Sequence, residues 1–154
     1  MLIEPTWVGL SSSEIVTIVK AGRKPRYFYK FVPVGNAVRK LEIWKQQDCE
    51  IFYLSSRTLP NEVDDIRNVL VKYRFPAGTF LYRKYGEAYK DIAERIIPDI
   101  LIEDDYASDG GVADMTYPHL NPEAKKKIIS IIIPEFSGID QLPDNIIDLA
   151  NYSK

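Results

Sequence analysis

The apolar positions of the chain follow two spacings, one typical of helices and the other typical of strands. Apolar residues recurring every three or four positions predict amphipathic helices over residues 11–22, 36–47, 60–73, 88–97 and 143–150. Short runs rich in β-branched and aromatic residues predict strands at 2–4, 50–56, 79–83, 99–103 and 127–133. Helical and extended segments therefore alternate along most of the chain.

Capping residues fix the ends of two of these helices. Ser11 precedes the first helical segment, and Glu14 stands three residues later, which predicts a capping box. Gly22 is placed to end the same helix. We expect Asp144 to cap the last helix.

Alternating strands and helices favour βαβ units. We therefore expect one α/β domain over residues 1–154, with a mainly parallel, Rossmann-like sheet that carries helices on both faces. In such sheets ligands bind beyond the carboxyl ends of the strands. Residues that follow a strand are accordingly the first candidates for a functional site.

Three acids, Glu103, Asp104 and Asp105, end the apolar strand 99–103. Neighbouring carboxylates repel one another, and a hard cation such as Mg²⁺ relieves this repulsion, so Asp104 and Asp105 are candidate metal ligands. The alternative is that one acid caps a turn while the other faces solvent. The pair Gly110–Gly111 could present backbone amides to an anion or could simply form a turn.

Hydroxyl and basic residues follow the neighbouring strands. Ser55, Ser56 and Arg57 come directly after a strand, where hydroxyls, free amides and a guanidinium suit a phosphate. Lys84 and Lys90 both lie between the third strand and the acid-ending strand, and either could neutralise phosphate. The alternative for each is an ordinary solvated side chain.

Composition excludes several function classes. Acids and bases are interspersed, with a formal net charge of -2, so we expect neither nucleic-acid nor membrane binding. The segment 26–31, RYFYKF, then suggests a packed loop or a homodimer surface. Cys49 and His119 lack partners for catalysis or zinc binding, and a lone cysteine fits a cytoplasmic protein. Abundant Ile, Lys, Glu and Tyr suggest a thermophilic source.

Two stretches resemble motifs of the haloacid-dehalogenase (HAD) superfamily. IFYLSSR, 51–57, is similar to its hydroxyl-bearing second motif, and KDIAERIIPDILIEDD, 90–105, is similar to its lysine and acidic motifs. The resemblance covers about residues 35–105 and looks like an uncharacterised microbial branch. It implies an HAD-like fold in which Ser55 binds a phosphoryl group, Lys90 or Lys84 neutralises charge, and Asp104 and Asp105 hold Mg²⁺.

The superfamily's first motif, Asp-x-Asp, has no clear counterpart. The segment MLIEPTWVGL, 1–10, places Glu4 where the nucleophile belongs and Thr6 where the acid/base belongs. Glutamate shifts the carboxylate by one methylene, and threonine cannot act as a general acid near neutral pH. The short spacing between this first strand and the strand that ends at Ser55 leaves little room for a large cap, so residues 22–34 can form at most a flap.

Three functions follow from this reading. The first is an HAD-like phosphate-handling protein, a Mg²⁺-dependent phosphohydrolase with a degenerate catalytic motif in which Glu4 and Lys90 act as catalytic residues. The second is a catalytically inactive module that binds a small phosphorylated molecule in the same pocket. The third is an interaction protein that forms homodimers through the aromatic segment 26–31.

Overall fold

The computed structural model describes residues 1–25 and 27–152, so Arg26 of the aromatic segment lies outside the described residues. Its strands are β1 (Leu2–Ile3), β2 (Val32–Pro33), β3 (Phe52–Ser55), β4 (Thr79–Tyr82), β5 (Ile100–Asp104) and β6 (Ile129–Ile133). Its α-helices are α1 (Ser12–Lys20), α2 (Ala37–Lys45), α3 (Pro60–Lys72), α4 (Tyr89–Ile96), α5 (Pro122–Lys127) and α6 (Ile146–Ala150). Short 3-10 helices are η1 (Pro5–Trp7), η2 (Phe28–Lys30), η3 (Gly111–Ala113) and η4 (Tyr117–His119).

The strands pair in three two-stranded sheets. β3 pairs in parallel with β4, and β5 pairs in parallel with β6, whereas β1 pairs antiparallel with β2. The mixed α/β class is confirmed, with parallel pairing in the β3–β4 and β5–β6 sheets. The single mainly parallel sheet that the sequence predicts is instead divided among three separate ladders in the described part of the chain. β1, which directly precedes Glu4 in the chain, forms no ladder with either parallel pair.

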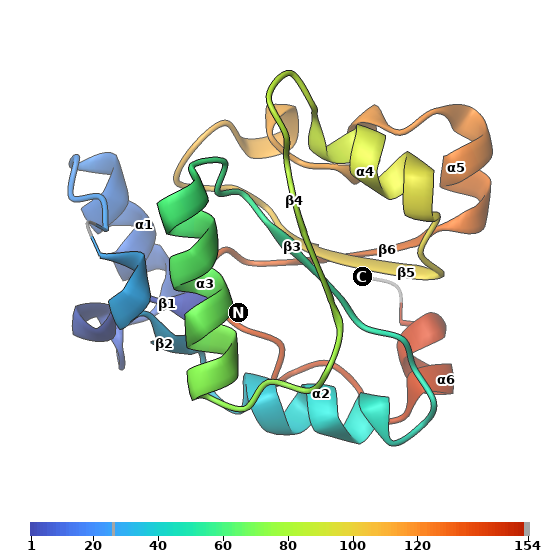
Figure 1. The fold of residues 1–154 in the computed structure, drawn as a ribbon, viewed down its shortest axis with the longest axis horizontal. Helices are drawn as coiled ribbons and strands as arrows, with labels where there is room; N and C mark the ends of the chain where they lie inside the picture. The colour runs from blue at the N-terminus through green and yellow to red at the C-terminus, as the bar shows by residue number, and fades with distance from the viewer. Residues whose placement is uncertain (26, 153–154) are drawn as a thin grey trace.

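Helices lie on both sides of the parallel strands, as the sequence predicts. Figure 1 shows α4 and α5 together on one side of β5 and β6, with α2 and α6 on the other, and α3 beside β4. α1 lies with β1 and β2 at the left edge of the same view. None of the helices in the described part of the chain is long and apolar enough to cross a membrane.

The capping box at α1 is confirmed. The Glu14 amide donates to the Ser11 hydroxyl at 3.4 Å, and the Ser11 amide donates to the Glu14 carboxylate at 2.8 Å. The predicted cap of the last helix is wrong by one residue, because the Asn145 side chain accepts the first free amides of α6. Asp144 instead pairs with the buried ammonium of Lys40.

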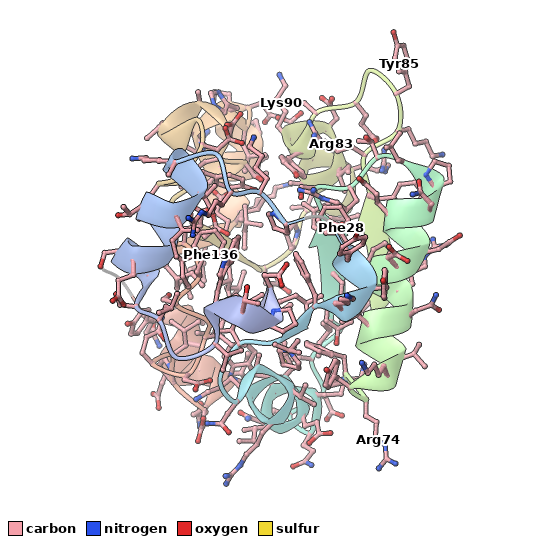
Figure 2. The ribbon with its side chains drawn as sticks, turned by 90° about the vertical axis from the view of Figure 1, so that its left-hand side faces the viewer. Phe28, Arg74, Arg83, Tyr85, Lys90 and Phe136 are labelled. Atoms are coloured by element: carbon pink, nitrogen blue, oxygen red, sulfur yellow. The ribbon has the colours of Figure 1, made fainter. Side chains whose placement is uncertain are left out.

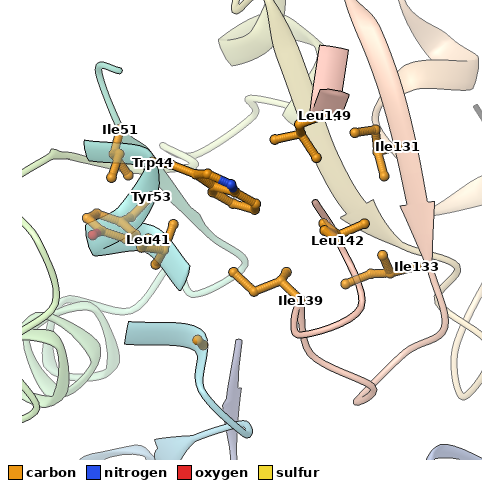
Figure 3. Close-up of a cluster of buried hydrophobic side chains, with 10 residues drawn as sticks. Leu41, Trp44, Ile51, Tyr53, Ile131, Ile133, Ile139, Leu142 and Leu149 are labelled. Atoms are coloured by element: carbon orange, nitrogen blue, oxygen red, sulfur yellow. The ribbon is translucent and has the colours of Figure 1, made fainter. Parts of the chain in front are cut away.

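One hydrophobic cluster joins the two parallel pairs (Figure 3). It comprises Ala37, Leu41, Trp44, Ile51, Tyr53, Ile131, Ile133, Ile139, Leu142 and Leu149, which come from α2, β3, β6, α6 and their connections. Ile100 and Ile102 of β5 and Phe80 of β4 pack against it. Four of the strands therefore share a core although their backbones form two separate ladders.

Smaller clusters attach the flanking helices. Ala93, Leu120, Ala124 and Ile128 hold α4 and α5 against Leu101 of β5. Ile3, Trp7 and Ile15 hold α1 to the N-terminal strand, where Trp7 meets Phe136 edge-on at 5.6 Å between ring centroids. The contact between Trp7 and Phe136 ties the start of the chain to the segment that follows β6.

Candidate functional site

Ser55, Ser56 and Arg57 occupy the end of β3, as the sequence predicts. The Arg57 amide donates to the Ser55 hydroxyl at 3.2 Å, which forms a tight turn directly after the strand. The Arg57 guanidinium donates to the Ser56 hydroxyl through Nε at 3.1 Å and through an Nη at 2.6 Å. Ser56 therefore orients Arg57.

An aromatic ring covers one face of the Arg57 guanidinium. The guanidinium carbon of Arg57 lies 4.6 Å from the ring centroid of Phe28. Phe28 belongs to η2, which packs against α3, and its ring meets Phe31 edge-on at 5.3 Å. Phe28 of η2 thus covers the Arg57 guanidinium at the end of β3.

Arg83 directly follows β4, as Ser56 directly follows β3. Ser55 pairs with Tyr82 in the β3–β4 ladder, so the next residues on the two strands are Ser56 and Arg83. The Arg83 guanidinium lies 4.5 Å from the ring centroid of Tyr89, and its buried Nε has no hydrogen-bond partner among the residues that the structure describes. Figure 2 shows Arg83 and Phe28 on the same side of α3.

Two tyrosines connect Arg83 with the acids at the end of β5. Tyr89, which carries the Arg83 guanidinium on its ring, lies close enough to Tyr106 to act on the pKa of that phenol. Burial raises the pKa of Tyr106, and the nearby Tyr89, Asp104 and Glu103 act in the same direction. The ends of β4 and β5 are therefore linked through Arg83, Tyr89, Tyr106 and Asp104.

Asp104 is held in an environment that disfavours its charge. Burial raises the pKa of its carboxyl, an effect partly offset by a 3.1 Å hydrogen bond from the Tyr106 amide and by the charge of the Met1 ammonium. The charges of Glu135 and Asp105 add to the rise. A carboxyl that is destabilised as an anion at the end of a parallel strand is a recurrent feature of functional sites.

Asp105 is engaged in shaping the loop. Its Oδ1 accepts the Glu135 amide at 3.0 Å and the Ala107 amide at 3.2 Å. The Glu135 carboxylate in turn accepts the Ser108 amide at 2.6 Å and the Ser108 hydroxyl at 2.8 Å. These bonds tie the segment after β5 to the segment after β6.

Glu103, the first acid of the run, has a structural role. Its buried carboxylate accepts the Thr116 amide at 2.6 Å and the Tyr117 amide at 2.9 Å. Both oxygens are therefore occupied by the backbone of the loop that leads into η4. The three successive acids therefore have different roles: Glu103 holds the loop before η4, Asp105 holds the segments after β5 and β6, and burial raises the pKa of Asp104.

The lysine and glutamate candidates lie outside this cluster of contacts. Lys84 is exposed in the loop after β4, where its amide donates to Glu87, and Lys90 is an exposed residue of α4 at the rim of the view in Figure 2. Glu4 accepts a 3.4 Å hydrogen bond from the Thr6 hydroxyl. The preceding strand, β1, pairs with β2 and with neither parallel ladder, while the Met1 ammonium at its start lies close enough to Asp104 to offset part of the rise that burial causes in the pKa of that carboxyl.

The remaining sequence candidates have local partners. The Gly110 amide donates to Asp114 at 2.8 Å and the Gly111 amide to the Tyr106 carbonyl at 3.0 Å, which is the turn alternative. His119 Nε2 lies 3.0 Å from the Val112 carbonyl oxygen. Burial raises the pKa of the Cys49 thiol, which favours its protonated form.

We use the name edge site for Ser55, Ser56, Arg57, Arg83, Tyr89, Asp104 and Tyr106, the residues that these contacts bring to the carboxyl ends of β3, β4 and β5. Sequence reasoning missed Arg83, Tyr89 and Tyr106. The available signal for two of them was position, because Arg83 ends the predicted strand 79–83 and Tyr106 follows the acids at the end of β5.

A metal ligand set is not assembled by these acids alone. Within residues 1–25 and 27–152, no group of three or more His, Cys, Asp or Glu side chains is arranged to hold a metal ion. Mg²⁺ often takes one or two protein carboxylates and completes its shell with water and phosphate. Asp104 and Asp105 therefore stay a predicted pair of ligands.

Comparisons with protein-family models, with curated proteins and with solved structures gave no match. The HAD resemblance accordingly stays a prediction based on the two short motifs, and the function must be argued from the geometry of the edge site.

Proposed function

We propose that the protein binds a small phosphorylated molecule at the edge site, on an HAD-like parallel framework. The observation that carries this proposal is the Arg83 guanidinium, whose buried Nε has no hydrogen-bond partner among the residues described. A buried donor without a partner costs about 1–3 kcal/mol. An oxyanion that accepts from this group removes that cost when it binds.

A second arginine and a hydroxyl support the same ligand chemistry. Arg57 and Arg83 come from neighbouring strand ends, and neither forms an ion pair with a described carboxylate. Each is braced by an aromatic ring, Phe28 or Tyr89, which fixes the plane of its guanidinium. Planar guanidinium groups with free N–H donors match the oxygens of phosphate better than point charges do.

The test is stabilisation by phosphate. We expect inorganic phosphate and simple phosphate esters to raise the melting temperature of the wild-type chain, and Arg83→Gln to lose most of this rise. At a ligand concentration about 100 times Kd, binding adds about 2.7 kcal/mol to the free energy of unfolding. Equal stabilisation of wild type and Arg83→Gln would overturn the assignment.

Arg67→Gln is the matched control. Arg67 also lies over aromatic rings, 5.2 Å from Phe80 and 5.5 Å from Tyr82, but it is exposed on α3 and pairs with Asp64. Its loss removes the same charge and a similar stacking contact without touching the edge site. Phosphate should stabilise this variant as it stabilises the wild type.

Mg²⁺-dependent phosphate hydrolysis is the second candidate, favoured by the raised pKa of Asp104 beside Glu135 and Asp105. A divalent cation held by Asp104 and Asp105 would relieve this repulsion and would neutralise charge on a bound phosphate. Phosphate release from a panel of esters, measured with and without Mg²⁺, tests turnover. Release that requires Mg²⁺ and is abolished in Asp104→Asn/Asp105→Asn would establish an enzyme, whereas binding without release would leave a binding module.

A further inference from the structure

The two parallel ladders leave one edge of β5 without backbone partners. The Asp105 amide donates to the Ile133 carbonyl at 3.0 Å, and the Ile129 amide donates to the Asp99 carbonyl at 2.9 Å. These bonds and the ladder register show that odd-numbered residues of β5 direct their backbone groups toward β6. The backbone groups of Ile100, Ile102 and Asp104 therefore point to the opposite edge.

β3 has a corresponding free edge. The Thr79 amide donates to the Ile51 carbonyl at 2.8 Å, so odd-numbered residues of β3 face β4, and Phe52 and Leu54 face away from it. Across residues 1–25 and 27–152, no backbone hydrogen bond joins the outward-facing groups of Phe52 and Leu54 or those of β5 to another segment.

The two free edges border the same core. Tyr53 of β3 is part of the main hydrophobic cluster, and Ile100 and Ile102 of β5 pack against that cluster. In Figure 1 the strand direction turns steadily from β6 and β5, nearly horizontal, through the diagonal β3 to the nearly vertical β4. This order is that of a single twisted parallel sheet, interrupted between β5 and β3.

Burial is also incomplete at the interruption. Ile100, Leu101 and Ile102 form the continuous apolar run typical of a central parallel strand, yet all three are only partly buried. On the other edge, Phe52 is partly buried and Leu54 is 36% exposed. Both flanks thus carry apolar side chains that a neighbouring strand would cover.

We propose that the interval between β3 and β5 is a docking site for one extended peptide strand, parallel to both. Free N–H and C=O groups on both flanks select an extended backbone, which offers donors and acceptors on its two edges, whereas a helix satisfies its own. A strand of four or five residues matches the lengths of β3 and β5. Its side chains are apolar on both faces, because core and helix flank the adjoining strands.

The proposal is independent of phosphate binding, although such a strand would end beside Ser55 and Asp104. Hydrogen exchange of the full chain tests the free edges first. Without any peptide, the amides of Phe52, Leu54, Ile100 and Ile102 should exchange at least 10-fold faster than those of Tyr53, Leu101 and Glu103, which face partner strands. Equally slow exchange at both sets would show that the edges are already paired and would overturn the proposal.

The occupant is tested with an amidated peptide, Lys-Lys-Val-Ile-Val-Ile-Val-Lys-Lys, added in trans and also joined to Met1 by a flexible glycine-serine linker. A tether raises the effective concentration to the millimolar range, so that weak docking is still detected. We expect selective slowing at Phe52, Leu54, Ile100 and Ile102, and none with a control peptide whose central valine is proline, which lacks the amide donor.

Three results would count against a docked strand. No slowing with the tethered peptide would overturn the docking site, and equal slowing with the proline control would indicate non-specific adhesion. Slowing that rises with protein concentration in the absence of peptide would show that a second copy of the chain covers these edges instead.

Discussion

The guanidinium of Arg83 lies over the ring of Tyr89, with its carbon 4.5 Å from the ring centroid and its buried Nε without a hydrogen-bond partner in the described part of the chain. The ring stabilises the cation, but no acceptor satisfies the donor. We expect this combination where an arginine binds a ligand. The unsatisfied donor lowers the stability of the free protein, and a bound acceptor would remove that cost.

The first prediction concerns Arg83→Met without ligand. The substitution forfeits a cation–π contact worth about 0.5–1 kcal/mol and removes an unsatisfied donor that costs about 1–3 kcal/mol. The free energy of unfolding should therefore be unchanged or should rise by up to about 2 kcal/mol, as measured by urea denaturation in phosphate-free buffer. A loss of more than about 1 kcal/mol would indicate that Arg83 serves the fold.

The second prediction concerns the pH dependence set by Asp104. Burial raises the pKa of its carboxyl, so the folded chain holds this proton more tightly than the unfolded chain does. Stability therefore declines as pH rises from the ordinary aspartate value, about 3.9, through the raised pKa. Asp104→Asn keeps an oxygen for the Tyr106 amide and removes the charge.

Asp104→Asn should accordingly be more stable than wild type at neutral pH, and the difference should vanish as pH falls below the ordinary aspartate range. Urea denaturation at several pH values measures it. Asp64→Asn, a change at an exposed residue of α3, provides the control and should show no comparable trend. A variant less stable than wild type at neutral pH would show that the Asp104 charge stabilises the fold.

Local signals in the sequence predicted the elements well and their assembly less well. Ser11 and Glu14 act on neighbours within one turn, and their capping box forms as expected. At α6 two adjacent residues, Asp144 and Asn145, could each cap the helix, and the choice depends on Lys40, about one hundred positions away. The pairing of strands likewise depends on contacts between residues that are distant in sequence. The sequences of the individual strands therefore did not indicate that β3–β4 and β5–β6 would form separate ladders.

The candidate site was likewise predicted only in part from the sequence. Ser55, Arg57 and Asp104 were identified because parallel strands deliver their following residues to one edge. Arg83 was missed because an arginine at a strand end is ordinary in sequence, and its Tyr89 partner is defined only by the packing of α4. The roles of the three acids also needed structure, since only the fold shows that Glu103 faces the Thr116 and Tyr117 amides.

The third prediction follows from the corrected cap of α6. The Asn145 side chain accepts the Ile147 amide at 2.8 Å, so Asn145→Ala should lower the free energy of unfolding by about 1 kcal/mol. Asp144→Ala acts differently, because within the described part of the chain it leaves the buried Lys40 ammonium with the Leu142 carbonyl as its one acceptor. That loss should be about 1–3 kcal/mol and should be largely reversed in Lys40→Met/Asp144→Ala. Rescue by Lys40→Met would be absent if Asp144 were the cap.

The fourth prediction separates Glu103 from the edge site. Glu103→Gln replaces one of two carboxylate acceptors with an amide NH₂ group, which then faces a backbone N–H donor of Thr116 or Tyr117. A buried donor left without an acceptor costs about 1–3 kcal/mol, and the lost bond is charge-assisted, so we expect a loss of about 2–3 kcal/mol in the free energy of unfolding. Phosphate should still raise the melting temperature of this variant by the wild-type increment, because Glu103 contacts the loop before η4 and not the arginines. Retention of wild-type stability together with loss of the phosphate effect would instead place Glu103 in the ligand site.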